Sequence, residues 1–146
     1  MAVWIGRRSK EMDAWLGRIG AHAGGFISAW NPLSRRMPQG WNDRMQRRLA
    51  ERLHRHAIMP ASGTLHRWHE AHLLTAAHPK RLLRLARLFR QRGVVVVKCR
   101  QTARLMLLDW RSQPDATKPL NAAIPPLLAR ESSFSSRRDT MHRGCR

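Results

Sequence analysis

The first hydrophobic pattern along the chain has the spacing of an α-helix. Its apolar members recur every three or four residues: Met12, Trp15, Leu16 and Ile19. Ser9 stands at the N-cap position, so a short helix is predicted to begin after it and to stop by the Gly-Gly pair at 24–25. Residues 26–30 are then a short, mainly apolar run closed by the turn-forming Asn-Pro pair at 31–32, and they predict a strand.

Two longer segments repeat the helical period. Residues 42–56 place their apolar side chains on one face, and Asn42 is the predicted N-cap. Residues 79–91 begin at Pro79, a residue favoured at the first helical position, and Gly93 is predicted to end that helix. Each segment has basic residues on its other face, which is the pattern of a helix lying on the surface of a domain.

Four further short runs predict strands: residues 57–59, 68–75, 94–97 and 105–108. The first two form a hairpin-like pair, with Pro60 and Gly63 expected to interrupt the first of them. The third is a run of valines, whose branched side chains favour extended backbone. It is the strongest strand pattern in the chain.

The order of these elements predicts the fold class. After the first helix it runs strand, helix, strand, strand, helix, strand, with one more strand at residues 105–108. This order is typical of an α+β, ferredoxin-like split β-α-β sandwich, in which two helices cover one face of an antiparallel sheet. We therefore predict one domain over residues 1–110, in which the short N-terminal helix precedes the sandwich. Residues 111–146 are rich in proline, serine and arginine without a hydrophobic period, and they predict a basic, flexible tail.

Charge is the unusual part of the composition. Lys and Arg number 28 against nine acids, which gives a net charge of +19. Such an excess favours contact with polyanions, and nonspecific nucleic acid is the partner that we expect. The candidate contacts lie on the polar faces of the two longer helices: Arg44, Arg47, Arg48, Arg55, Arg84 and Arg87. A compositional preference for arginine would produce the same numbers, so this alternative stays open.

Several classes of protein are excluded or disfavoured. Two cysteines are too few for a disulfide scaffold or a four-thiolate zinc site. No apolar run approaches the ~20 residues that span a bilayer, and the N-terminus lacks the apolar core of a secretory signal, so we expect a cytoplasmic protein without membrane contact. The chain contains no nucleophile elbow, phosphate-binding loop or dinucleotide-binding glycine pattern, and no cofactor is expected.

A set of polar and aromatic residues gathers around the predicted first strand and the helix after it. Its members are Asn31, Ser34, Asn42, Gln46, Trp68 and Glu70. Residues just beyond a strand and at the start of the next helix converge at one end of the unit, where ligands often bind. These residues are therefore candidates for a polar ligand pocket. The alternative is a structural network, in which they fix the turn, cap the helix and tie the loop to it.

The same residues resemble a known family. Ile5-Gly6, the segment Ala29-Trp30-Asn31-Pro32 with Ser34, and the later Gly63, Trp68 and Glu70 are similar to the bacterial domain-of-unknown-function family DUF3293. The resemblance covers roughly residues 4–110 and includes the helix that ends Leu88-Phe89-Arg90-Gln91. It implies a bacterial globular domain and draws attention to these polar positions, but it implies no reaction.

The histidines His66, His69 and His72 lie close in sequence, next to Glu70. Their spacing matches no established zinc pattern, and on a strand His69 faces away from the other two, so no metal site is predicted. Two hypotheses about function remain. The first is a small binding protein that associates with nucleic acid through its arginines. The second is a small enzyme or ligand-binding domain that uses the pocket around Asn31, Asn42 and Glu70.

Overall fold

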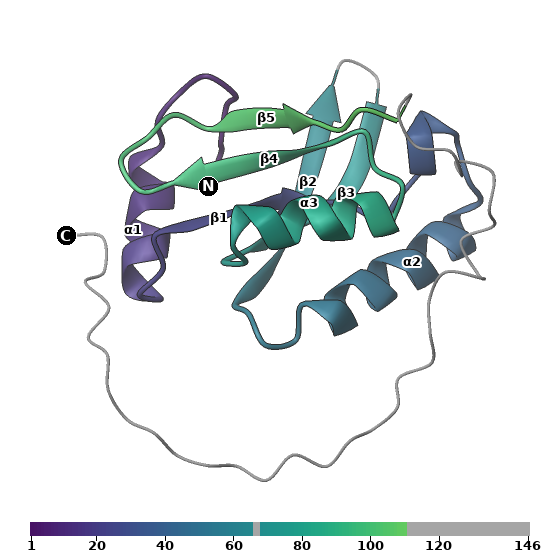
Figure 1. Cartoon of the computed structure of the whole chain (residues 1–146), viewed down its shortest axis with the longest axis horizontal. Coiled ribbons are helices and arrows are strands. Elements are labelled where there is room, and N and C mark those ends of the chain that lie inside the picture. Colours follow the sequence, from purple (N-terminus) through teal and green to yellow (C-terminus); the bar gives the residue numbers. More distant parts are fainter. Residues whose placement is uncertain (66–67, 111–146) are drawn as a thin grey trace, which may run out of the picture.

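A computed structural model describes residues 1–65 and 68–110 of the chain. Within these residues the helices are α1 (Lys10–Arg18), α2 (Gln39–Arg52) and α3 (Pro79–Leu88), with a short 3-10 turn at Pro32–Ser34. The strands are β1 (Ala23–Ile27), β2 (Ile58–Leu65), β3 (Trp68–Thr75), β4 (Gly93–Lys98) and β5 (Arg104–Leu107). Figure 1 shows α3 lying across the sheet and α2 beside it. The tail predicted over residues 111–146 lies outside the described residues.

The strands form one sheet in the order β2-β3-β1-β4-β5, and every neighbouring pair is antiparallel. The central strand is β1, in which Phe26 pairs with Leu74 of β3 on one side and with Val95 of β4 on the other. The predicted α+β class is therefore confirmed. The order differs from that of a four-stranded ferredoxin-like sheet because β5 extends the sheet beyond β4.

Both faces of the sheet are covered by helices. The alternating valines of β4 divide between the two faces, since Val94 and Val96 pack with α2 and α3, whereas Val95 and Val97 pack with α1. Leu49 of α2 is fully buried in the first of these clusters. The two longer helices thus share one face, as predicted, and the N-terminal helix closes the other.

The N-terminal helix begins as its sequence predicts. The Ser9 hydroxyl accepts a hydrogen bond from the backbone N–H of Met12 at 3.2 Å, which satisfies one of the free donors of the first turn. The helix ends earlier than predicted, because Gly20 adopts a left-handed φ of 65° just beyond it. The Gly-Gly pair at 24–25 is therefore not the stop.

Those two glycines belong to β1, and the prediction of a strand over 26–30 was displaced by three residues. A Cβ on Gly24 would lie 2.3 Å from the carbonyl oxygen of Thr75, and one on Gly25 would lie 2.3 Å from that of Val95. The backbones of β3 and β4 thus approach β1 more closely than any side chain allows. The strand ends at Ile27, so Ser28, Ala29 and Trp30 belong to the connection that follows.

The prediction that Asn42 caps the second helix was wrong. The N-cap of α2 is Pro38, which makes no side-chain capping bond, and the helix starts at Gln39. Asn42 therefore lies one turn inside α2, where it is almost completely buried. Its amide is free to bond to another part of the chain.

The first strand of the hairpin is longer than predicted. β2 runs without interruption through Pro60 and Gly63 and pairs with β3 along its whole length. Proline is tolerated because β2 is an edge strand, whose outer backbone donors have no partner strand to lose. At Gly63 a Cβ would lie 2.5 Å from the imidazole ring of His72, so that ring would have to move to admit one. The prediction for β3, residues 68–75, is confirmed.

The third helix begins at Pro79, as predicted, but it ends at Leu88. Arg90, with a left-handed φ of 54°, takes the position expected of a glycine, and the N–H of Gln91 donates to the carbonyl of Ala86 at 2.8 Å. Gly93 begins β4 instead of ending the helix. None of the helices described here is both long and apolar enough to cross a membrane.

Candidate functional site

The connection from β1 to α2 has an unusual backbone. Asn31, Leu33 and Ser34 have φ values of 46°, 53° and 61°, a region that residues with a side chain rarely adopt. The N–H of Leu33 donates to the carbonyl of Arg90 at 2.7 Å, and the N–H of Ser34 donates to that of Asn31 at 2.9 Å. The first bond holds the strained segment against the end of α3, and the second closes a turn within the segment. Such strain persists where the surrounding structure fixes it, often at binding sites.

The side chain of Asn31 organises this segment. Its Oδ1 accepts from the backbone N–H of Met37 at 3.0 Å and from Nδ2 of Asn42 at 3.2 Å. In return, the backbone N–H of Asn31 donates to Oδ1 of Asn42 at 3.0 Å. Asn42 also donates to the carbonyl of Met37 at 3.3 Å. The two amides thereby fasten both ends of the loop to the first turns of α2.

Glu70 and Gln46 join the same region from β3 and α2. Nδ2 of Asn31 donates to Oε1 of Glu70 at 2.9 Å, a bond between residues 39 positions apart in sequence. Oε1 of Gln46 accepts from the backbone N–H of Ala29 at 3.0 Å. Nε2 of Gln46 is buried and has no hydrogen-bond partner in the described part of the chain. The prediction that these residues converge is thus supported by their contacts.

Not every candidate takes part. Ser34 is exposed, does not line the pocket described below, and only its backbone is hydrogen-bonded in the described residues. Trp68 lines the pocket, while Gln46 and Glu70 bond to its surroundings without lining it. The polar atoms of Asn31 and Asn42 are largely used by one another. These hydrogen bonds make the two residues one rigid side of the pocket, here called the Asn31–Asn42 wall.

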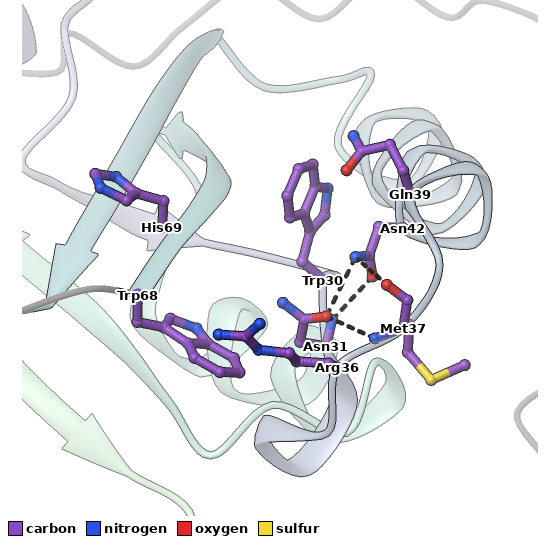
Figure 2. A pocket seen from close by; sticks show the side chains of 8 residues that line it. All are labelled: Trp30, Asn31, Arg36, Met37, Gln39, Asn42, Trp68 and His69. Atoms are coloured by element: carbon purple, nitrogen blue, oxygen red, sulfur yellow. Dashed lines mark hydrogen bonds between the residues drawn. The ribbon is translucent and has the colours of Figure 1, made fainter.

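A surface pocket of about 300 Å³ lies beside this wall (Figure 2). It is lined by Trp30, Asn31, Arg36, Met37, Gln39, Asn42, Trp68 and His69. The guanidinium of Arg36 lies over the Trp68 ring, 5.3 Å from its centroid. Nε1 of Trp30 is buried with no hydrogen-bond partner among the described residues. Among the described residues no carboxylate lines the pocket, so its polar character comes from the Arg36 cation, side-chain amides and the imidazole of His69.

Sequence reasoning missed several of these residues. Arg36 was not distinguished from the other arginines, because its stacking on Trp68 depends on a loop whose path no periodic pattern encodes. Gln91 was also missed as part of this region, although it lies in the segment that carries the family resemblance. Its Nε2 donates to the carbonyls of Trp30 at 2.9 Å and of Phe89 at 3.1 Å, which ties the pocket loop to the end of α3.

The predicted arginine contacts form a second candidate site, here called the arginine face. It consists of Arg44, Arg47 and Arg48 on α2, Arg55 just after it, and Arg84 and Arg87 on α3. All six are exposed, and none pairs with a carboxylate of residues 1–65 or 68–110. The ion pair found among the described residues joins Arg8 to Asp13, beside α1. Nη2 of Arg81 donates to the carbonyl of Arg52 at 2.7 Å and links the end of α2 to the start of α3.

The positive charge around these helices also acts on a neighbouring histidine. Burial lowers the pKa of His56, and the charge of Arg81 and of His54 lowers it further. The histidines nearer the pocket make local polar contacts. Nδ1 of His69 contacts the Thr64 hydroxyl at 3.1 Å, and Nδ1 of His72 lies 3.1 Å from the carbonyl oxygen of Glu70. In the described ranges, no group of three or more metal-ligating side chains is close enough to hold an ion.

Residues 27–94 match the model of a family described as a protein of unknown function, DUF3293. The resemblance to that family is thereby confirmed over these residues. The matched segment includes every residue that lines the pocket and all six members of the arginine face. No curated protein and no solved structure matches the chain.

Proposed function

We propose that this chain, through its DUF3293 segment, is a small binding protein that associates with nucleic acid by electrostatic attraction. The observation that carries the proposal is the arginine face. Five exposed guanidinium groups lie on two helices that cover the same side of the sheet, a sixth, that of Arg55, follows α2, and no carboxylate of the described residues pairs with them. Unpaired cations on a rigid surface release counterions when they meet phosphates, and this release supplies the affinity.

The route of binding differs from that of the RNA-binding modules that stack bases on an open sheet. Here α1 covers one face of the sheet and α2 and α3 cover the other. Trp15 of α1 is buried against the sheet, and Trp41 and Trp110 pack against the other cluster, so these indoles are engaged in the core. Contacts to phosphates from the helices carry no sequence information directly, so the proposed binding tolerates any sequence.

A charge-reversal experiment tests the proposal. Arg47→Glu with Arg48→Glu should weaken binding of a labelled single-stranded oligonucleotide by about tenfold or more at roughly 50 mM salt. Arg7→Glu with Arg18→Glu is the matched control, because it changes the net charge equally but lies beside α1 on the opposite face. The control should bind almost as tightly as the wild type. No affinity for DNA or RNA at this salt, or equal losses in both double variants, would refute the proposal.

The enzyme alternative has less support from the contacts. Asn31 and Asn42 bond to one another, and the Glu70 carboxylate bonds to Asn31 without lining the pocket. General acid–base chemistry needs a titratable group that can reach a substrate proton. The imidazole of His69 lines the pocket, but its Nδ1 contacts the Thr64 hydroxyl, and Figure 2 shows the ring directed away from Trp68 and Arg36. The pocket is therefore better suited to holding a ligand than to reacting with it.

We also propose the finer features of the architecture. The part β2-β3-β1-β4 is antiparallel throughout and has α2 and α3 on one face, which supports a ferredoxin-like unit extended by β5. Both core clusters are built from residues up to Leu108, which supports one domain over residues 1–110 with 111–146 as a basic extension. A bacterial, cytoplasmic setting fits the composition and remains part of the proposal.

A further inference from the structure

The pocket has features that point to a planar ligand rich in hydrogen-bond acceptors. The Trp68 ring offers an aromatic surface, and its present occupant is the guanidinium of Arg36. Arg36 is exposed and pairs with no carboxylate of the described chain. The Trp30 indole adds a buried N–H that the described protein leaves unsatisfied. A buried donor without a partner is costly, and a ligand acceptor removes that cost only if the Trp30 side chain turns, because Nε1 has no exposed surface.

The position of the pocket relates it to the arginine face. Gln39 and Asn42, in the first turns of α2, line the pocket, and Arg44 and Arg47 follow on the same helix within about two turns. A strand whose phosphates lie along the arginines of α2 would therefore pass the mouth of the pocket. The Asn31–Asn42 wall keeps the opening in place without ligand, because its hydrogen bonds are internal.

We infer that this pocket takes one unpaired nucleobase of a bound strand, stacked on Trp68 in the place that Arg36 now occupies. The inference rests on the proposed function, because the base must belong to a strand that the arginine face has bound. A base gains more from stacking on an aromatic ring than an exposed cation gains from lying over it, so the base displaces the guanidinium. The released Arg36 then contacts a phosphate of the same strand. A volume of about 300 Å³ is large enough for one base and its sugar but too small for a longer segment of the strand.

This arrangement makes the protein distinguish single strands from duplexes. A duplex presents the same phosphates to the arginine face, but its bases are paired and stacked and cannot enter the pocket. Single-stranded oligonucleotides should therefore bind more tightly than duplexes of equal length, and Trp68 should be responsible for the difference.

The test compares Trp68→Ala, Trp68→Phe and Trp4→Ala with the wild type, on a ten-nucleotide single strand and on the ten-base-pair duplex, with circular dichroism confirming that each variant folds. Trp68→Ala should weaken the single-strand complex about tenfold or more and leave duplex binding unchanged. Trp68→Phe should retain most of the affinity, because phenylalanine preserves a stacking surface. Trp4→Ala, which removes an indole that is 68% exposed and outside the pocket, should change neither affinity.

The outcomes separate this inference from the proposed function. If Trp68→Ala leaves the single-strand affinity unchanged, or weakens both complexes equally, the inference fails while binding to the arginine face stands. If neither oligonucleotide binds, a titration with a nucleoside monophosphate, followed by tryptophan fluorescence, decides the matter. Quenching that Trp68→Ala abolishes would keep the pocket as a site for a free nucleotide and overturn the proposed function alone. Absence of quenching would overturn both.

Discussion

Asn31 and Asn42 hold one another by two reciprocal hydrogen bonds, from the backbone N–H of Asn31 to Oδ1 of Asn42 at 3.0 Å and from Nδ2 of Asn42 to Oδ1 of Asn31 at 3.2 Å. Both residues are buried, with 9% and 3% of their surface exposed. The bonds join a left-handed residue after β1 to the second turn of α2. They replace the helix cap that the sequence predicts at Asn42, and they explain how the loop keeps its strained backbone.

The stability of this pair can be measured directly. Asn42→Ala should reduce the free energy of unfolding by about 1–3 kcal/mol, because it leaves the buried N–H of Asn31 without an acceptor. Asp43→Ala is the matched control on the same helix. The Asp43 carboxylate bonds only to the exposed Gln39 amide in the described residues, so its loss should change stability by less than about 0.5 kcal/mol. Urea unfolding curves that show equal effects for the two variants would contradict a structural role for Asn42.

Gln46 provides a second test of how buried amides stabilise the connection between β1 and α2. Gln46→Leu should cost about 1–3 kcal/mol, since it removes the acceptor for the N–H of Ala29, a fully buried residue. The cost is partly offset, because leucine also removes Nε2, which has no partner in the part of the chain that the structure describes. Gln39→Leu, at an exposed position of the same helix, should be nearly neutral. Equal or greater stability of Gln46→Leu than of the wild type would show that the buried amide is kept for a ligand, since functional polar groups often reduce stability.

The sequence predicts the local features of the fold whose signals are short and unambiguous. Ser9 and Pro79 mark helix starts correctly, and the valines of β4 alternate between the two faces as a buried strand must. Glycine and proline are harder to interpret, because their effect depends on neighbours distant in sequence. Gly25 permits close contact with β4, and Pro60 is tolerated only because β2 lies at the edge of the sheet.

The candidate site is predictable to a similar extent. The convergence of Asn31, Asn42 and Glu70 follows from their places at the end of a strand, on the next helix and on the neighbouring strand. Their roles do not follow, since an asparagine before a helix pattern indicates a cap as readily as a buried crosslink. The stacking of Arg36 on Trp68 depends on a loop in which Asn31, Leu33 and Ser34 have left-handed φ values, and no sequence pattern predicts that geometry.

The central strand should tolerate no side chain at its glycines. A Cβ on Gly25 would lie 2.3 Å from the Val95 carbonyl oxygen and 2.8 Å from Cδ1 of Leu82, and the backbone oxygen can move only if the sheet opens. Gly25→Ala should therefore lower the free energy of unfolding by ~2 kcal/mol or more. Gly40→Ala, in the first turn of α2, meets no atom within 4 Å and should stabilise the protein by about 0.4–1 kcal/mol. Thermal unfolding of the two variants measures both effects, and similar behaviour would contradict the close approach of β1 and β4.

Acidification should loosen the attachment of α1. Partial burial acts to raise the pKa of the Asp13 carboxyl, but hydrogen bonds from the backbone N–H of Arg100 and from Arg8, both at 2.7 Å, hold that pKa below its ordinary value. A carboxyl with a depressed folded-state pKa stabilises the protein above its unfolded value of 3.8, and this contribution is lost as the pH falls through the folded-state pKa.

Comparison with Asp13→Asn isolates this contribution. The variant should be less stable than the wild type at neutral pH, and the difference in the free energy of unfolding should shrink as the pH falls below about 4. Glu11, whose pKa its own backbone hydrogen bond and Ser9 also lower, is present in both proteins, so its titration cancels in the difference. A difference that stays constant from neutral pH to pH 2 would show that the charge of Asp13 contributes nothing to the fold.

The last prediction concerns how salt acts on nucleic-acid binding, and it separates contacts of the arginine face from the general effect of a net charge of +19. For a single strand, the slope of log affinity against log salt concentration decreases by about 0.7 for each phosphate contact that is lost. Arg47→Ala with Arg48→Ala should therefore make the slope shallower by about 1.4, and the loss of affinity should be similar for different sequences. Arg7→Ala with Arg18→Ala removes as much charge from the opposite side and should leave the slope unchanged, because no phosphate lies against those residues. Equal slopes for the two double variants would mean that charge attracts the strand without a defined contact surface, and the arginine excess would then be a property of composition.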